Sequence, residues 1–204
     1  MPSKFRLRYL FRPLVNLIAK GLLRIRFTPN ATTVIMLCFS IISFISLGIY
    51  HSLPYFSIFV FITGIMDGCD GAIARLTNRS TKFGGFFDSF MDRISEFFIF
   101  LGLYFYIQNQ LLWNILDMKL VILISFTASI MISYTRARAE VFFKGDFDVG
   151  LMARSERLFY LVIISLISLF YNLFNLFLFI FMLLVLGTFV YRLINIYYKI
   201  KKKE

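Results

Sequence analysis

The chain has 204 residues, of which 59% are hydrophobic and 16% charged, whereas soluble domains average about 45–50% and about 25%. Its formal net charge is +11, from 22 basic and 11 acidic residues. High hydrophobicity and only two cysteines exclude disordered, fibrous and disulfide-rich secreted classes, and they indicate an integral membrane protein whose basic residues meet the anionic cytoplasmic leaflet or anionic substrates rather than nucleic acid.

Residues 1–27 form a basic segment with an amphipathic pattern. Its apolar positions oppose the lysines and arginines and include Phe5, Leu7, Leu10, Leu14 and Leu17. No uncharged stretch precedes Arg12, so the segment is too charged for a cleavable signal peptide. We expect a juxtamembrane amphipathic helix in the membrane interface, with a basic tail lacking regular structure as the alternative.

Six apolar stretches follow, and a spanning helix needs about 20 mostly apolar residues to cross a hydrocarbon core of about 30 Å. The first four are residues 31–50, 53–66, 97–116 and 120–135, the third helix beginning near residue 85. The last uncharged run, 158–191, is too long for one span, and Tyr171, Asn172 and Asn175 predict a turn within it. The fifth helix then begins near residue 150.

The sequence therefore predicts an all-α integral membrane protein with six transmembrane helices plus an N-terminal interfacial amphipathic helix. One membrane domain covers residues 1–204, with the six-helix bundle at 28–197 and a basic cytoplasmic tail at 198–204. An even number of spans puts both termini on one side, and of the basic residues only Lys119 falls on the opposite side. We expect a multi-pass protein of the cell membrane with both termini and the active site cytoplasmic.

Acidic residues gather where the second predicted helix ends and the third begins. The five are Asp67, Asp70, Asp88, Asp92 and Glu96. Carboxylates at membrane depth are costly and indicate function. The i, i+3 spacing of Asp67 and Asp70 and the i, i+4 spacing of Asp88 and Asp92 place each pair on one helical face. Two facing helices would bring the four aspartates together.

An all-oxygen site of four carboxylates suits Mg²⁺ or Mn²⁺, whereas zinc prefers histidine or cysteine. Two such ions can clamp a phosphoryl group during an in-line displacement. The alternative is a purely structural role, in which the acids pair with nearby bases. These bases are Arg75, Arg79, Lys82 and Arg93.

Glycines beside the acids complete a longer pattern. Residues 67–92 read Asp-x-x-Asp-Gly-x-x-Ala-Arg, eight residues, then Gly-x-x-x-Asp-x-x-x-Asp. This pattern resembles the signature of the CDP-alcohol phosphotransferase family at every fixed position. The resemblance implies six transmembrane helices, a juxtamembrane helix and transfer of a phosphatidyl-type group from a CDP-linked lipid, CDP-diacylglycerol or CDP-archaeol, to an alcohol with release of CMP.

The resemblance also implies residue roles. Asp67, Asp70, Asp88 and Asp92 would hold two Mg²⁺ or Mn²⁺ ions, and Asp92 would be the general base that activates the acceptor hydroxyl. The nucleotide contacts would be Asp70, Gly71, Ala74, Arg75 and Gly84, together with Asn30. Asn30 belongs to residues 28–33, which resemble the family's T-P-N-x-x-T entry to the first helix. Taken alone, that segment is equally a proline-containing helix start.

The connection between the fourth and fifth helices is rich in arginine, which favours an acceptor that already carries a phosphate. Residues 133–140 and 149–158 resemble S-Y-x-[KR]-A-R-A-E and V-G-x-x-E-R-x-E-R of the phosphatidylinositol phosphate and archaetidylinositol phosphate synthase branch, with Ala153 where the branch often has Glu. The acceptor, inositol phosphate, would be bound by Arg136, Arg138, Arg154 and Arg192. Contact with lipid headgroups is the alternative reason for these arginines.

Other acceptors, namely glycerol 3-phosphate, serine and free inositol, fit the same family chemistry. An aspartate-rich prenyltransferase shares the Asp88-x-x-x-Asp92 element but not the other pair, and it needs more helices. A divalent-cation transporter could use the four acids as a selectivity site, but it requires a polar path through the outer half of the helices. Family members are commonly homodimers, so a homodimer is expected.

Overall fold

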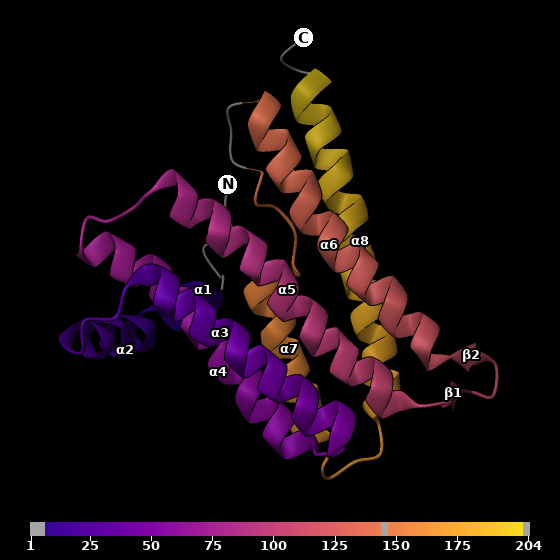
Figure 1. The fold of residues 1–204 in the computed structure, drawn as a ribbon. Helices are drawn as coiled ribbons and strands as arrows, with labels where there is room; N and C mark the ends of the chain where they lie inside the picture. Colours follow the sequence, from indigo (N-terminus) through magenta and orange to yellow (C-terminus); the bar gives the residue numbers. More distant parts are fainter. Residues whose placement is uncertain (1–6, 144–146, 202–204) are drawn as a thin grey trace.

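The computed structural model describes residues 7–143 and 147–201, and in this part of the chain it is almost entirely helical (Figure 1). Its elements are α1 (Leu7–Leu10), α2 (Arg12–Arg24), α3 (Pro29–Phe44), the π-helical turn η1 (Ile45–Ile49), α4 (Leu53–Leu76), α5 (Lys82–Ile107), β1 (Leu111–Leu112), β2 (Leu116–Asp117), α6 (Met118–Phe142), α7 (Arg154–Ile167) and α8 (Phe174–Lys201). Residues 1–6 of the predicted juxtamembrane segment and 202–204 of the predicted tail lie outside the described residues.

Four helical segments among the described residues are long and apolar enough to cross a membrane: Pro29–Ile49, α4, α6 and α8. The other two predicted spans are of a different kind. Helix α5 has 26 residues but carries Asp88, Asp92, Arg93 and Glu96, and α7 has 14 residues, about 21 Å at 1.5 Å per residue. The described part of the chain is therefore a helical membrane protein with four segments that are long and apolar enough to span a membrane.

The predicted third helix, to residue 116, was too long. Helix α5 ends at Ile107, because Gln108 has a φ of 50° and leaves the helical conformation. A short hairpin follows, in which β1 pairs antiparallel with β2 through Leu112 and Leu116. Trp113 and Asn114 turn the hairpin with φ of 54° and 59°, the left-handed backbone that tight hairpin loops require. Apolar composition alone does not reveal this turn.

Other helix ends also differ from the prediction. The fourth helix was expected at 120–135, but α6 continues to Phe142 and carries the arginines of its last turns on a helix. The fifth begins at Arg154 rather than near residue 150. The predicted break near Tyr171 is confirmed, because α7 ends at Ile167 and α8 begins at Phe174.

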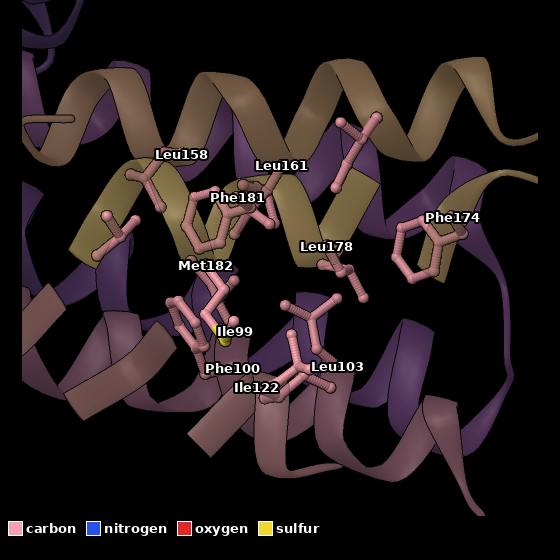
Figure 2. Packing of buried hydrophobic residues seen from close by; sticks show 14 of the residues in the cluster. Ile99, Phe100, Leu103, Ile122, Leu158, Leu161, Phe174, Leu178, Phe181 and Met182 are labelled. Atoms are coloured by element: carbon pink, nitrogen blue, oxygen red, sulfur yellow. The ribbon is translucent and has the colours of Figure 1, made fainter. Parts of the chain in front are cut away.

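The helices form two groups. In the first, α3 packs on α4 and α5, and in the second, α6 packs along α8. The groups meet where α5 contacts α6 and where α7, which packs on α4, also contacts α8. Figure 2 shows the core of this junction, where Phe181 and Met182 of α8 lie between Leu158 and Leu161 of α7 and Ile99 and Phe100 of α5. These side chains are buried within the bundle, whereas many other large apolar side chains are exposed, as expected of a surface that faces lipid.

Helix α2 lies against α4 near the end of the bundle where α4 is joined to α5 (Figure 1). Its Val15 fits over Gly68, where an added Cβ would lie 3.0 Å from a Val15 methyl group. Ala19 of α2 is buried with Ala72 and Ile73 of α4. The N-terminal helices are thereby placed beside the acidic residues, and Leu7, Arg8, Phe11 and Arg12 line the same cavity as those acids.

Candidate active site

The structure brings together three of the four predicted metal ligands. Asp67 comes from α4, and Asp88 and Asp92 come from successive turns of α5. One carboxylate oxygen of each lies within 4.8 Å of the others. Helix α3 contacts both α4 and α5, so it holds the two acidic helices in this arrangement.

Asp70 lies at the buried side of the cluster and is held by α3. Its Oδ2 accepts a hydrogen bond of 2.9 Å from Thr33 Oγ1, and its Oδ1 accepts one from the backbone amide of Gly71. Asp70 and Thr33 are both buried. The predicted T-P-N-x-x-T segment is therefore tied to the acidic pattern through its last threonine, which the sequence analysis did not assign to the site.

Arg154, at the first position of α7, is the cation that meets the cluster. Its Nη1 contacts Asp67 Oδ1 and Asp92 Oδ1, and its Nη2 donates to Ser95 Oγ at 2.7 Å. Among the residues that the structure describes, Asp67 and Asp92 therefore form ion pairs with Arg154, and no ion pair joins them to the nearby bases Arg75, Arg79, Lys82 and Arg93. Because Arg154 is distant in sequence from both aspartates, residue spacing gave no sign of this contact.

The residues present fit a divalent ion. Asp88 Oδ1 is buried and has no hydrogen-bond partner among the described residues, which is a costly arrangement unless a cation or another donor satisfies it. The candidate metal-ligand atoms of the cluster are all carboxylate oxygens, which suit Mg²⁺ or Mn²⁺. The chemistry of the donor set and the unpaired oxygen thus both point to an acidic site that can bind a divalent metal.

The cluster opens into a cavity of about 670 Å³, within the size range of small-molecule sites. Acidic and basic side chains both line it, and the basic ones come from α1, α2, α4, α5, α6, α7 and α8. The lining arginines are Arg8, Arg12, Arg75, Arg93, Arg136, Arg154, Arg157 and Arg192. A cavity with carboxylates beside many guanidinium groups suits a metal-bound, phosphate-bearing substrate.

Three of the six predicted nucleotide contacts line this cavity. They are Asp70, Gly71 and Arg75. Asn30 and Gly84 lie beside each other at the starts of α3 and α5, since a Cβ added to Gly84 would lie 3.6 Å from Asn30 Oδ1. Ala74 is half-buried on α4, one residue before Arg75, and it is not among the described residues that line the cavity.

Two predicted acceptor arginines converge on an acid that the sequence analysis did not single out. Asp148 is buried and lies 3.3 Å from Arg192 Nη2, 3.5 Å from Arg136 Nη1 and 3.8 Å from Arg8 Nη1. Arg192 also donates to the backbone oxygens of Val149 at 2.9 Å and Ile132 at 2.8 Å. Arg192 thus joins α8, α6 and the connection before α7.

Arg138 differs from the other predicted acceptor arginines. Its guanidinium lies 4.5 Å from the centre of the Phe142 ring, on an exposed part of α6. It is not one of the described residues around the cavity. The structure therefore brings Arg136, Arg154 and Arg192 to the cavity and leaves Arg138 outside it.

Comparison with known proteins identifies relatives over most of the chain. Residues 26–193 match the family model described as CDP-alcohol phosphatidyltransferase. The archaetidylinositol phosphate synthase of Pyrococcus horikoshii is 30% identical over 151 residues, 74% of this chain and 76% of that protein. The phosphatidylinositol phosphate synthase of Mycobacterium tuberculosis strain H37Rv is 35% identical over 154 residues, 74% of this chain and 68% of the relative.

Solved structures of Mycobacterium tuberculosis phosphatidylinositol phosphate synthase have the same fold. The crystal structure with CDP-DAG bound matches with a TM-score of 0.78 and 28% identity, covering 91% of this chain and 94% of the other. The structure in complex with manganese and citrate also matches with a TM-score of 0.78, covering 90% and 88%.

Proposed function

The chain belongs to the CDP-alcohol phosphatidyltransferase family and is a membrane transferase of phospholipid biosynthesis, and we propose that it transfers a phosphatidyl-type group from a CDP-linked lipid to inositol phosphate, releasing CMP. The observation that carries this proposal is a shared cavity, which is lined both by the acids Asp67, Asp88 and Asp92 and by the bases Arg136, Arg154 and Arg192. The acids suit the metal and diphosphate of the donor, and the bases suit the phosphate of the acceptor.

We assign the chemistry to the residues of the cluster. Asp67, Asp70, Asp88 and Asp92 would hold two Mg²⁺ or Mn²⁺ ions, which would supply neutralisation of the diphosphate charge. Asp92 accepts the proton of the acceptor hydroxyl. The hydroxyl oxygen forms a bond to the phosphorus that carries the lipid, and the bond from that phosphorus to CMP breaks. Arg75, Gly71, Ala74, Gly84 and Asn30 orient the nucleotide.

The acceptor phosphate would be bound by Arg136, Arg154 and Arg192. The names of the relatives, archaetidylinositol phosphate synthase and phosphatidylinositol phosphate synthase, support inositol phosphate as the acceptor. The guanidinium groups by themselves would suit any phosphorylated polyol. Arg154 contacts Asp67 and Asp92 and lines the cavity, so it lies between the acids and the proposed site of the acceptor phosphate. Arg138, outside the cavity, is given no contact with the acceptor in this proposal.

We propose six membrane spans, with α5 and α7 completing the four clear ones, in one domain over residues 1–204. Helix α2 would lie in the interface as a juxtamembrane helix. Both termini and the cavity would face the cytoplasm across the cell membrane, which the basic residues at these helix ends support through the positive-inside rule. The donor lipid would enter from the bilayer, and the chain would work as a homodimer.

The test is CMP release from CDP-diacylglycerol or CDP-archaeol by the purified protein with Mg²⁺. The acceptors to compare are myo-inositol 1-phosphate, glycerol 3-phosphate, serine and free inositol, with Asp92→Asn as the inactive control. Release that requires both inositol phosphate and Asp92 is the expected result. Preference for another acceptor would refute the acceptor assignment and leave the transfer chemistry intact. Absence of CMP with every acceptor would favour the divalent-cation transporter.

A further inference from the structure

A buried ion pair joins α5 to α7 next to the carboxylate cluster. Arg157 Nε donates to Glu96 Oε1 at 2.8 Å, and Arg157 Nη2 donates to Glu96 Oε2 at 3.0 Å, so the guanidinium binds both carboxylate oxygens. The remaining nitrogen, Nη1, donates to the backbone oxygen of Met152 at 3.0 Å. Both side chains are only 1% exposed. All three guanidinium nitrogens and both carboxylate oxygens therefore make a hydrogen bond, and the pair is buried in the wall of the cavity.

The pair is in register with the catalytic groups. Glu96 follows Asp92 by four residues on α5, and Arg157 follows Arg154 by three residues on α7, so each lies on the same helical face as its neighbour. Asp92 and Arg154 are themselves in contact. Two ionic contacts thus connect α5 and α7 on successive turns.

Stability alone does not explain such a pair. Burying two charges costs about as much as their attraction returns, and apolar side chains of similar size are often equally or more stabilising. A glutamate and an arginine in helices of a membrane bundle add an insertion cost. What a bidentate pair does supply is geometry, because the planar fork accepts the carboxylate in one orientation.

We propose that Glu96 and Arg157 are positioning residues, which fix the register of α7 against α5 and so hold Arg154 where it meets the acceptor phosphate. The inference rests on the proposed function, since it gives Arg154 a phosphate to bind. Because Glu96 and Arg157 are bound to each other and only 1% exposed, their effect passes through the first turn of α7. Arg157 also donates to the backbone oxygen of Met152, which precedes that turn. The same arginine therefore also fixes the position of the connection that leads from Asp148 to α7.

The test compares the double variant Glu96→Met/Arg157→Met with Arg157→Lys, which keeps the charge but loses the fork. Each should remain folded, with the KM for myo-inositol 1-phosphate raised about ten- to a hundredfold, the range seen when supporting residues of a site are lost, and the KM for the CDP-lipid unchanged. Calorimetric binding of inositol phosphate without the CDP-lipid should weaken by the same factor. The matched control is Tyr160→Phe, which removes the 3.1 Å bond to the Phe177 backbone oxygen and so loosens α7 from α8 instead of α5. Its acceptor KM should not change.

An unchanged acceptor KM in both folded variants overturns the inference, as does an equal rise in the KM for donor and acceptor, which would indicate general distortion. Failure of both variants to fold would make the pair a stability element and would also overturn it. If the unaltered chain releases no CMP with any acceptor, the proposed function fails and this inference fails with it. Activity of the unaltered chain with unaffected variants refutes the inference alone.

Discussion

Replacing Thr33 by valine is expected to weaken metal binding at the carboxylate cluster. Thr33 Oγ1 donates to Asp70 Oδ2 at 2.9 Å between α3 and α4, and both residues are buried. Valine has nearly the same shape as threonine, so the substitution removes the donor while leaving the packing almost intact. The Asp70 carboxylate would then lose the contact that fixes its orientation beside Asp67 and Asp88.

The magnitude follows from the kind of bond that is lost. A hydrogen bond to a charged group contributes about 1.5–3 kcal/mol. Since about 1.4 kcal/mol corresponds to a tenfold change in an equilibrium constant, Mn²⁺ should bind roughly ten- to a hundredfold more weakly. The Mn²⁺ concentration that gives half-maximal CMP release should rise by a similar factor. Loss of a ligand's supporting partner in other metal sites has effects of about this size.

The neighbouring threonine supplies a matched control. Thr32 is also buried, and its Oγ1 donates to the Thr28 backbone oxygen at 3.1 Å, as Thr33 Oγ1 does to the Pro29 backbone oxygen at 3.2 Å. Thr32→Val therefore loses the same kind of helix contact without touching a carboxylate. The amount of bound Mn²⁺ is obtained from the decrease in the electron paramagnetic resonance signal of the free ion when protein is added. Equal Mn²⁺ affinity in Thr33→Val and Thr32→Val would refute the reasoning, and Thr33→Ser should retain the affinity of the unaltered chain.

Four substitutions and one treatment with a chelator have defined outcomes. Asp92→Asn should lower CMP release by about 10²- to 10⁴-fold, as expected for loss of a general base, in an assay at saturating Mg²⁺. Chelation with EDTA should abolish release, and Mg²⁺ or Mn²⁺ should restore it. Arg136→Met should raise the acceptor KM about tenfold, in line with loss of one charge-assisted phosphate contact, and Arg138→Met should have a smaller effect. Gly150→Ala should lower the melting temperature, because Gly150 has a φ of +113° and an added Cβ would lie 2.5 Å from Thr188 Cγ2.

The spacing of residues predicted the acidic side of the site because its members lie on two helices. Asp67 and Asp70 share a face of α4, Asp88 and Asp92 share a face of α5, and periodicity within a helix is readable from the sequence. The contact of Arg154 with Asp67 and Asp92 was not predictable in the same way. It depends on how α7 packs against α4 and α5, and no spacing within one helix contains that information.

The approximate positions of the long helices followed from hydropathy, whereas several helix ends did not, and four of the six predicted spans are helices long and apolar enough to cross a membrane. Apolar residues continue from α5 into the hairpin at Leu111 and Leu112, so composition runs past the point where Gln108 leaves the helix. The opposite error occurs at Arg136, where charge predicts the end of a span although α6 continues to Phe142. Charge and hydropathy report the membrane boundary, while hydrogen bonding decides where a helix ends.

The fold separates the two halves of the proposed reaction. Helix α3 packs on both α4 and α5, and these three helices carry the acids and the predicted nucleotide contacts. Helices α6 and α8 pack together and carry Arg136 and Arg192, while α7 carries Arg154. Acceptor preference can therefore change through the second group without altering metal or nucleotide chemistry in the first. The two groups must still meet with a precision of about 0.5 Å for in-line transfer, which is why the contacts between α5 and α7 are the part of this fold where a buried, bidentate ion pair has a purpose that apolar packing cannot fulfil.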